Sequence, residues 1–191
     1  MADGRPKYVT VLAETDTPQG WRPIKSAAGC LIDVPSGETV ASGLAMPHSP
    51  RVHGGHAWVL NSGVGRLCRV EPATGRCQDV TELPGYTRGM AMLGPYAFIG
   101  LSKIRETSTF GGVPIAERRD ELKCGVGAID LRTGRLGAHL EFVAGVDEIF
   151  DVVALPGALN PLFSGPHPEL DGGHPIWTVP TPDPLSRTTR G

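Results

Sequence analysis

The sequence has few of the features that mark membrane-spanning or secreted proteins. Only 6% of its 191 residues are aromatic. No apolar run approaches the roughly 18 residues needed to cross a bilayer. No apolar segment follows the charged residues at the N-terminus, as a secretory leader would require. We therefore predict a cytoplasmic location and no membrane partner.

Neither sign of charge predominates. The chain has 18 basic and 20 acidic residues, and its longest basic run is the pair Arg118-Arg119. Nucleic-acid binding needs Lys and Arg concentrated on one surface. We therefore expect no nucleic-acid partner.

Cysteine is also scarce, with four residues at positions 30, 68, 77 and 124. They lack the paired spacing of zinc sites and are too few for a disulfide scaffold. Cys68 and Cys77 flank one predicted hairpin, but we expect reduced thiols. The sequence contains no nucleophile elbow, zinc helix motif, P-loop or dinucleotide fingerprint. We interpret His-Gly-Gly-His at 53–56 as a turn rather than a metal site.

Glycine and proline are abundant, with 26 and 18 residues. They separate short, β-branched apolar runs, which is typical of many short antiparallel strands. The only helix that the sequence predicts runs from Pro114 to Lys123, where a proline precedes a series of helix-forming residues.

Three turns repeat along the chain without gaps. Each has an acidic residue four positions before a glycine, in the segments IDVPSG (32–37), VEPATG (70–75) and IDLRTG (129–134). A second element repeats as well, because residues 47–62 align with residues 87–102. Residues 150–157 (FDVVALPG) supply one more copy of its first strand. Both elements predict a strand, a tight turn and a returning strand.

Together the two elements form a unit of four strands, named a to d in chain order. The interval of 38 residues between Gly37 and Gly75 is the size of one propeller blade. We therefore predict an all-β, β-propeller-like fold, an incomplete arc of about three four-stranded blades over residues 1–160. The first blade lacks strand a, and the arc ends on a lone strand a near Gly157. Residues 161–191 are predicted to be a disordered tail.

Several segments resemble a family of bacterial conserved hypothetical proteins of unknown function. They include YVTVLAETDTPQGWR, LPGYTRGMA, FIGLSKIRE and CGVGAIDLRTG. The resemblance covers residues from about 3 to 160 and matches only the C-terminal half of the family's usual length. It implies a propeller-like architecture with missing N-terminal blades, and it supplies no catalytic residues. We expect either those missing blades or self-association to complete the fold.

Strand a lines the central channel of a propeller. His48, Arg88 and Asp151 occupy one position in three successive copies, so we expect them to converge on the axis. They either form a ligand site or bond neighbouring blades to one another. The long loops 15–29 and 105–123 should lie on one face. That face should also carry Trp21, Arg22, Asn61, Lys103, Asp147 and Glu148. Trp21 either stacks on a ligand or anchors its own loop.

These residues support three functional hypotheses. The preferred one is a binding domain that recognises a small anionic molecule or a protein segment through Arg22, Arg88 and Lys103. It requires no cofactor. The alternative is a metal-dependent hydrolase of the lactonase or esterase type, which requires a divalent cation; its ligand candidates are His48, Asn61, Asp147, Glu148 and Asp151. The third is a truncated fragment without independent activity.

Overall fold

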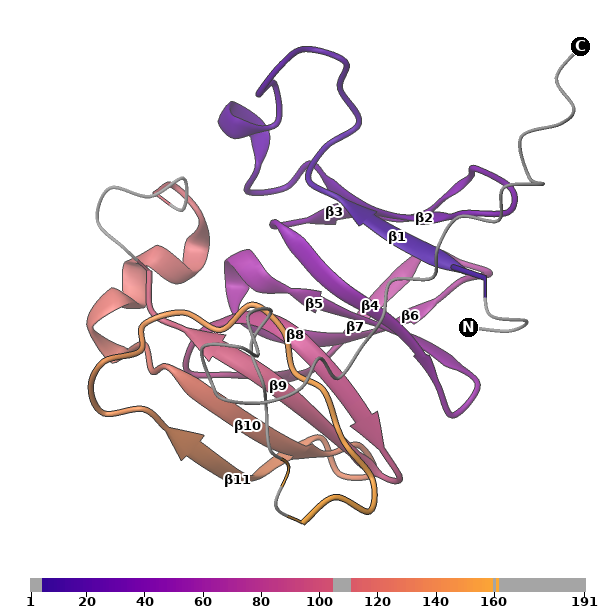
Figure 1. Ribbon diagram of the computed structural model, residues 1–191. Helices are drawn as coiled ribbons and strands as arrows, with labels where there is room; N and C mark the ends of the chain where they lie inside the picture. The colour runs from indigo at the N-terminus through magenta and orange to yellow at the C-terminus, as the bar shows by residue number, and fades with distance from the viewer. Residues whose placement is uncertain (1–4, 105–110, 160, 162–191) are drawn as a thin grey trace, which may run out of the picture. The chain divides into compact units, whose positions relative to one another are not determined.

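The computed structural model describes residues 5–104, 111–159 and 161, which form three antiparallel sheets (Figure 1). The first sheet contains β1 (Tyr8–Val11), β2 (Gly29–Asp33) and β3 (Thr39–Leu44). The second contains β4 (Pro47–His53), β5 (His56–Asn61), β6 (Arg66–Glu71) and β7 (Arg76–Glu82). The third contains β8 (Tyr86–Leu93), β9 (Tyr96–Ser102), β10 (Gly125–Asp130) and β11 (Arg135–Glu141). Within each sheet, strands that follow one another in sequence are neighbours, which confirms the all-β, blade-like prediction.

The three repeated turns have one geometry, as their sequences predict. Each glycine has a positive φ, between 69° and 73°, in the left-handed region that favours glycine. Each also donates its N–H to the carbonyl of the acidic residue four positions earlier, at 2.8–2.9 Å: Gly37 to Asp33, Gly75 to Glu71 and Gly134 to Asp130. The repeat in sequence is therefore a repeat of backbone structure.

Both faces of the second sheet are covered by apolar side chains of its neighbours. Toward the first sheet, one buried cluster contains Leu31, Ala41, Leu44, Ala57, Val59, Cys68 and Val70. Toward the third sheet, another contains Trp58, Leu60, Leu67, Leu83, Met90, Ala97, Ile99, Leu101 and Ile129. Alternate residues of β5 and β6 thus enter opposite clusters, because successive side chains of a strand point to opposite faces.

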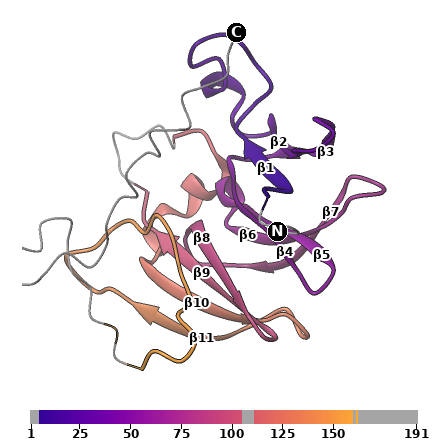
Figure 2. The same ribbon diagram turned by 45° about the vertical axis from the view of Figure 1, so that its right-hand side comes forward.

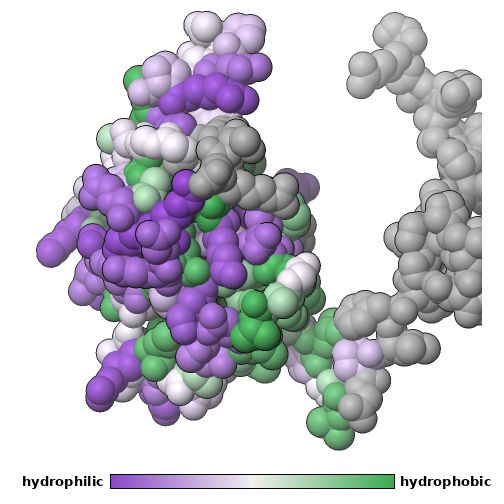
Figure 3. Space-filling view, turned by 90° about the vertical axis from the view of Figure 1, so that its left-hand side faces the viewer, coloured by the Kyte–Doolittle hydropathy of each residue, from purple (hydrophilic) through white to green (hydrophobic). Residues whose placement is uncertain are grey.

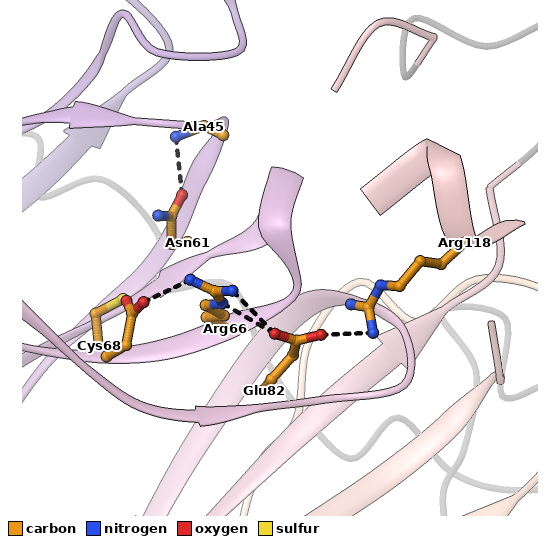
Figure 4. A network of polar contacts seen from close by, with 7 residues as sticks. Ala45, Asn61, Arg66, Cys68, Glu82 and Arg118 are labelled. Atoms are coloured by element: carbon orange, nitrogen blue, oxygen red, sulfur yellow. Dashed lines mark hydrogen bonds and ion pairs between the residues drawn. The ribbon is translucent and has the colours of Figure 1, made fainter. Parts of the chain in front are cut away.

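A third apolar cluster lies among the loops. Its buried members are Met46, Tyr86, Ile104, Val113, Ile115 and Leu122, with Trp21 packed against them. The two long loops that follow β1 and β9 therefore lie on the same side, as the sequence predicts. The second loop contains the 3-10 helix η3 (Pro114–Glu121), and Arg118 of this helix forms a salt bridge of 2.7 Å with Glu82 of β7 (Figure 4).

The first sheet has three strands, in agreement with the predicted absence of strand a. Within the described residues, β1 is hydrogen-bonded on one side only, to β2. β4 contacts both β1 and β8, and Figure 2 shows the sheet of β4 to β7 between the first and third sheets. The first strands of the second and third sheets are therefore neighbours.

Two sequence predictions differ from the structure. Residues 150–157 form no strand, because the described residues after them contain no strand b with which to build a ladder. The predicted helix from Pro114 to Lys123 is the shorter 3-10 helix η3, which Arg118 interrupts with non-helical backbone angles. Its sequence is mostly polar, so it offers no continuous apolar stripe that would stabilise a longer α-helix by packing.

Residues 155–191 are a unit separate from residues 1–154. Its described part contains a turn, in which Ala158 donates its N–H to the carbonyl of Leu155 at 3.2 Å. The predicted disordered tail lies outside the described residues, apart from Pro161. The two other 3-10 helices of the described chain are η1 (Arg22–Ile24) and η2 (Ser62–Val64).

Candidate functional site at the innermost strands

β4, β8 and the first part of residues 150–157, the three segments that the sequence aligns as strand a, lie side by side. Gly89 of β8 donates its N–H to Ser49 Oγ of β4 at 3.0 Å. On its other side, Gly89 is so close to the next segment that a Cβ on it would lie 2.5 Å from Asp151 Cα. Only glycine permits this approach of two backbones.

β4 and β8 are irregular at the same aligned position. Their register with the second strand shifts between His48 and Arg51 in one sheet, and between Thr87 and Met90 in the other. At these shifts Ser49 has a φ of 54° and Gly89 a φ of 78°. A bulge of this kind bends the strand and redirects its side chains. It directly follows His48 and Arg88, the two ionisable residues singled out from the repeat.

His48 is largely buried and held in one orientation. Its Nδ1 lies 2.8 Å from Met46 O, 3.1 Å from Ser62 Oγ and 3.4 Å from Tyr86 Oη. Since a carbonyl can only accept, Nδ1 carries the proton and Nε2 keeps its lone pair in the neutral ring. Burial lowers the pKa of His48, and the positive charge of Arg88 lowers it further, against the opposing effect of the bond to Met46. The imidazole is therefore neutral at pH 7.

Arg88 and Lys103 line a small cleft at the start of β8 and the end of β9. The cleft is lined by Tyr86, Arg88, Ser102, Lys103, Ile104, Glu148 and Ile149. The Arg88 guanidinium lies over the Phe150 ring, 4.5 Å from its centroid. Within the described residues, neither Arg88 nor Lys103 forms a salt bridge. Two half-buried cations thus share one cleft without a neutralising ion pair from the described chain.

The third segment is fixed to the end of β9 by backbone contacts. Ser102 Oγ accepts a hydrogen bond from Ile149 N at 2.9 Å and donates one to Ile149 O at 3.3 Å. Lys103 N donates to Asp147 O at 2.8 Å. Glu148 is thereby held at the cleft beside Lys103.

The structure separates the other predicted residues from this cleft. Asn61 Oδ1 accepts a hydrogen bond from Ala45 N at 2.8 Å, so its amide fixes the connection between β3 and β4 (Figure 4). The Asp151 carboxylate is mostly exposed and lies 3.7 Å from Arg51. Asp151 therefore adjoins Gly89 through its backbone, while its side chain pairs with another strand.

Trp21 and Arg22 belong to the loop cluster rather than to the cleft. Trp21 is half-buried against the apolar residues of the loops, and this packing favours its interpretation as an anchor. Arg22 is exposed, with its guanidinium carbon 5.4 Å from the Trp21 ring centroid.

Sequence reasoning missed Ser62, Tyr86 and Ser102 as parts of the site. The aligned repeat contained a signal, since Ser62 and Ser102 end the second strand in successive sheets. Ser62 lies beside His48, and Ser102 holds Ile149. Both serines are buried. A small polar residue at this position joins neighbouring innermost segments.

A family model described as a domain of unknown function, DUF4915, matches residues 1–163. The match includes all eleven strands, and the chain belongs to this family. No curated protein matches the chain. No helix in the part of the chain that the structure describes is both long and apolar enough to cross a membrane.

Proposed function

We propose that this member of the DUF4915 family is a β-propeller-type binding domain that recognises a small anionic ligand. The observation that carries the proposal is the cleft that contains both Arg88 and Lys103. Carboxylates and phosphates are the groups that such cations bind through charge-assisted hydrogen bonds. The cations stand on the innermost strand and at the end of its neighbour, where a rigid sheet positions them.

The surroundings of the cleft support binding of an anion rather than of a cation. His48 is neutral at pH 7 and adds no charge, and its Nδ1 proton is already used by Met46. Glu148 is the one carboxylate among the residues that line the cleft. It can orient a ligand that carries a hydroxyl or amino group beside its acidic group.

One observation favours the metal-dependent hydrolase as a second candidate. A neutral histidine whose Nδ1–H is bound to a carbonyl is the usual state of a metal-ligating imidazole. Two other members of the predicted ligand set have partners elsewhere. Asn61 is bound to Ala45, and the Asp151 carboxylate faces Arg51. A binding site therefore requires less rearrangement of these residues than a hydrolase site.

Calorimetric titration with inorganic phosphate and with malonate tests the proposal. We expect binding that weakens at least about tenfold in Arg88→Gln and in Lys103→Gln, because each variant loses a charge-assisted contact worth about 1.5–3 kcal/mol. Arg135→Gln, on exposed β11, is the matched control and should bind like the parent chain. Equal affinities in all three variants would refute the cleft as the site.

Chelator treatment separates the two candidates. A binding domain should keep its affinity for phosphate or malonate in EDTA and in Asp151→Ala. A hydrolase should lose ester or lactone hydrolysis under both conditions.

A further inference from the structure

A hollow in the second sheet brings together charged side chains away from the cleft of Arg88 and Lys103. It has a volume of about 480 Å³ and lies where β5 begins, β6 ends and β7 begins. Small-molecule sites usually have volumes of about 300–1,000 Å³. We propose that this hollow is a second binding site, and that it takes a phosphate monoester that also carries hydroxyl groups. Its polar lining residues are His56, Arg69, Glu71, Thr74, Arg76 and Gln78.

The strand register places these side chains on one face of the sheet. Arg69 is opposite Trp58 of β5 and opposite Gln78 of β7. His56 precedes Trp58 by two residues and therefore lies on the same face. The two rings meet edge to face, with centroids 6.3 Å apart. Trp58 itself packs in the apolar cluster toward the third sheet. This face of the sheet is thus apolar along part of its strands and charged at the end that forms the hollow.

Polarity alone does not mark a site on this protein, because Figure 3 shows hydrophilic side chains over much of the face that it draws. The arginines of the hollow differ from others in their partners. Arg66, on the same strand as Arg69, forms a salt bridge of 3.0 Å with Glu82. Within the described residues, Arg69 and Arg76 form no salt bridge. A bound anion can therefore contact both guanidinium groups without displacing a carboxylate of the described chain.

The repeat does not require a charged residue at the place of Arg69. Leu31 and Ala128 have the same place in the other two sheets, two residues before the acidic residue of the turn. Leu31 is fully buried in the cluster between the first and second sheets. At the place of His56 the third sheet has Tyr96. Arg69 is therefore a departure from the repeat that the packing of the sheets does not explain.

The two arginines and the turn between β6 and β7 suit a phosphate group. Guanidinium groups match phosphate oxygens in geometry and bind them through charge-assisted hydrogen bonds. Arg69 Nη2 donates to Gln78 Oε1 at 2.7 Å, which orients its guanidinium in the hollow. Thr74 Oγ1 accepts a hydrogen bond from Arg76 N at 3.3 Å, and this bond leaves the hydroxyl hydrogen of Thr74 for a ligand. The phosphate is therefore assigned to Arg69, Arg76 and Thr74.

Glu71 favours a phosphate ester with hydroxyl groups over inorganic phosphate. It is opposite Arg76 in the strand register and is the one carboxylate among the residues that line the hollow. An ionised carboxylate only accepts hydrogen bonds, so it repels a bare anion and binds a hydroxyl group. The amide nitrogen of Gln78 can donate to a hydroxyl oxygen. The volume of the hollow leaves room for such groups beside the phosphate.

This inference does not rest on the proposed function. The hollow and the cleft of Arg88 and Lys103 have no lining residue in common. A method that reports on each site separately can therefore confirm or refute one without the other.

NMR titration of the ¹⁵N-labelled 191-residue chain with glycerol 3-phosphate provides this test. The backbone amide signals of residues 69–78 should move, and the Kd read from them should rise at least about tenfold in Arg69→Gln and in Arg76→Gln. Arg135→Gln is the matched control, because Arg135 follows the turn of the third sheet as Arg76 follows that of the second. It should keep the parent's Kd at the hollow, and so should Lys103→Gln.

Inorganic phosphate is the control ligand. It lacks the hydroxyl groups, so it should bind at the hollow at least about tenfold more weakly than glycerol 3-phosphate. Arg76 is exposed, and Arg76→Gln should keep the parent's amide spectrum outside the hollow, which keeps the test valid if Arg69→Gln misfolds. The inference is overturned if the signals of residues 69–78 do not respond to glycerol 3-phosphate, if Arg76→Gln binds it like the parent chain, or if inorganic phosphate binds there equally well.

Discussion

The turn of the first sheet differs from its two counterparts in one respect. A Cβ added at Gly75 would lie 2.9 Å from Val40 O of the preceding sheet, and one at Gly134 would lie 2.9 Å from Val80 O. At Gly37 the added atom would meet nothing within 4 Å, although its φ of 73° matches the others. The three turns have one local structure, but in the part of the chain that the structure describes only two of them pack against another sheet.

This difference shows that local structure and sheet-to-sheet contact are separate properties of the repeat. The positive φ of the glycine belongs to the turn itself and occurs in all three sheets. The close contact with an outer strand belongs to a junction, and it occurs only where a preceding sheet is present. Most of the stability of such an array comes from these junctions between neighbours.

The largest expected effect is at an internal junction. Leu67 is fully buried between the second and third sheets, so Leu67→Ala should lower the free energy of unfolding by about 2–5 kcal/mol. Val9, on the open face of the first sheet, is 42% exposed, and Val9→Ala should cost less than about 1 kcal/mol. Urea denaturation of the two variants measures both losses of stability. Equal losses of unfolding free energy in the two variants would contradict the difference in burial between Leu67 and Val9.

A smaller effect separates the turns directly. Strain of alanine at positive φ should lower the free energy of unfolding by about 1–2 kcal/mol at both positions, and this should be the whole effect of Gly37→Ala. Gly75→Ala should lose about 1–3 kcal/mol more, because its Cβ also meets the carbonyl of Val40. Thermal unfolding of the two variants measures the difference. If the two variants unfold alike, the contact between β3 and the turn after β6 is wrong.

The smallest effect concerns the pH dependence of stability. Since burial lowers the pKa of His48 in the folded chain, the unfolded chain binds a proton first, near pH 6.5. The free energy of unfolding therefore keeps its full value with respect to this group above about pH 6.5. It decreases as the pH falls toward the lower pKa that His48 has in the folded chain. Unfolding free energies at pH 7.5 and 5.5 should differ less in His48→Gln than in the parent chain. An unchanged pH dependence of stability in His48→Gln would contradict the burial of a neutral ring at this position.

The backbone of the repeat could be predicted from the sequence, because the determinants of each turn lie within six residues. An acidic residue four positions before a glycine is enough to place Asp33, Glu71 and Asp130. The alignment of residues 47–62 with 87–102 also placed His48 and Arg88 on neighbouring strands. Glycine and short β-branched runs are strong local signals, so these elements needed no tertiary information.

The details of the site depended on contacts that no local pattern encodes. Asn61 is polar and lies at the end of a strand, like a binding residue, but its amide is bound to Ala45. Residues 150–157 have a strand's sequence, yet strand formation needs a partner strand that the described chain does not provide. Trp21 packs in a loop cluster whose members come from four separate regions of the chain.

Calorimetric titration of the parent chain and of Arg88→Gln with inorganic phosphate tests the central claim most directly. The account predicts that the parent chain binds phosphate and that the variant binds it at least about tenfold more weakly, because the cleft loses one of its two cations. Equal affinities in the parent chain and the variant would contradict the claim that the cleft of Arg88 and Lys103 binds anions.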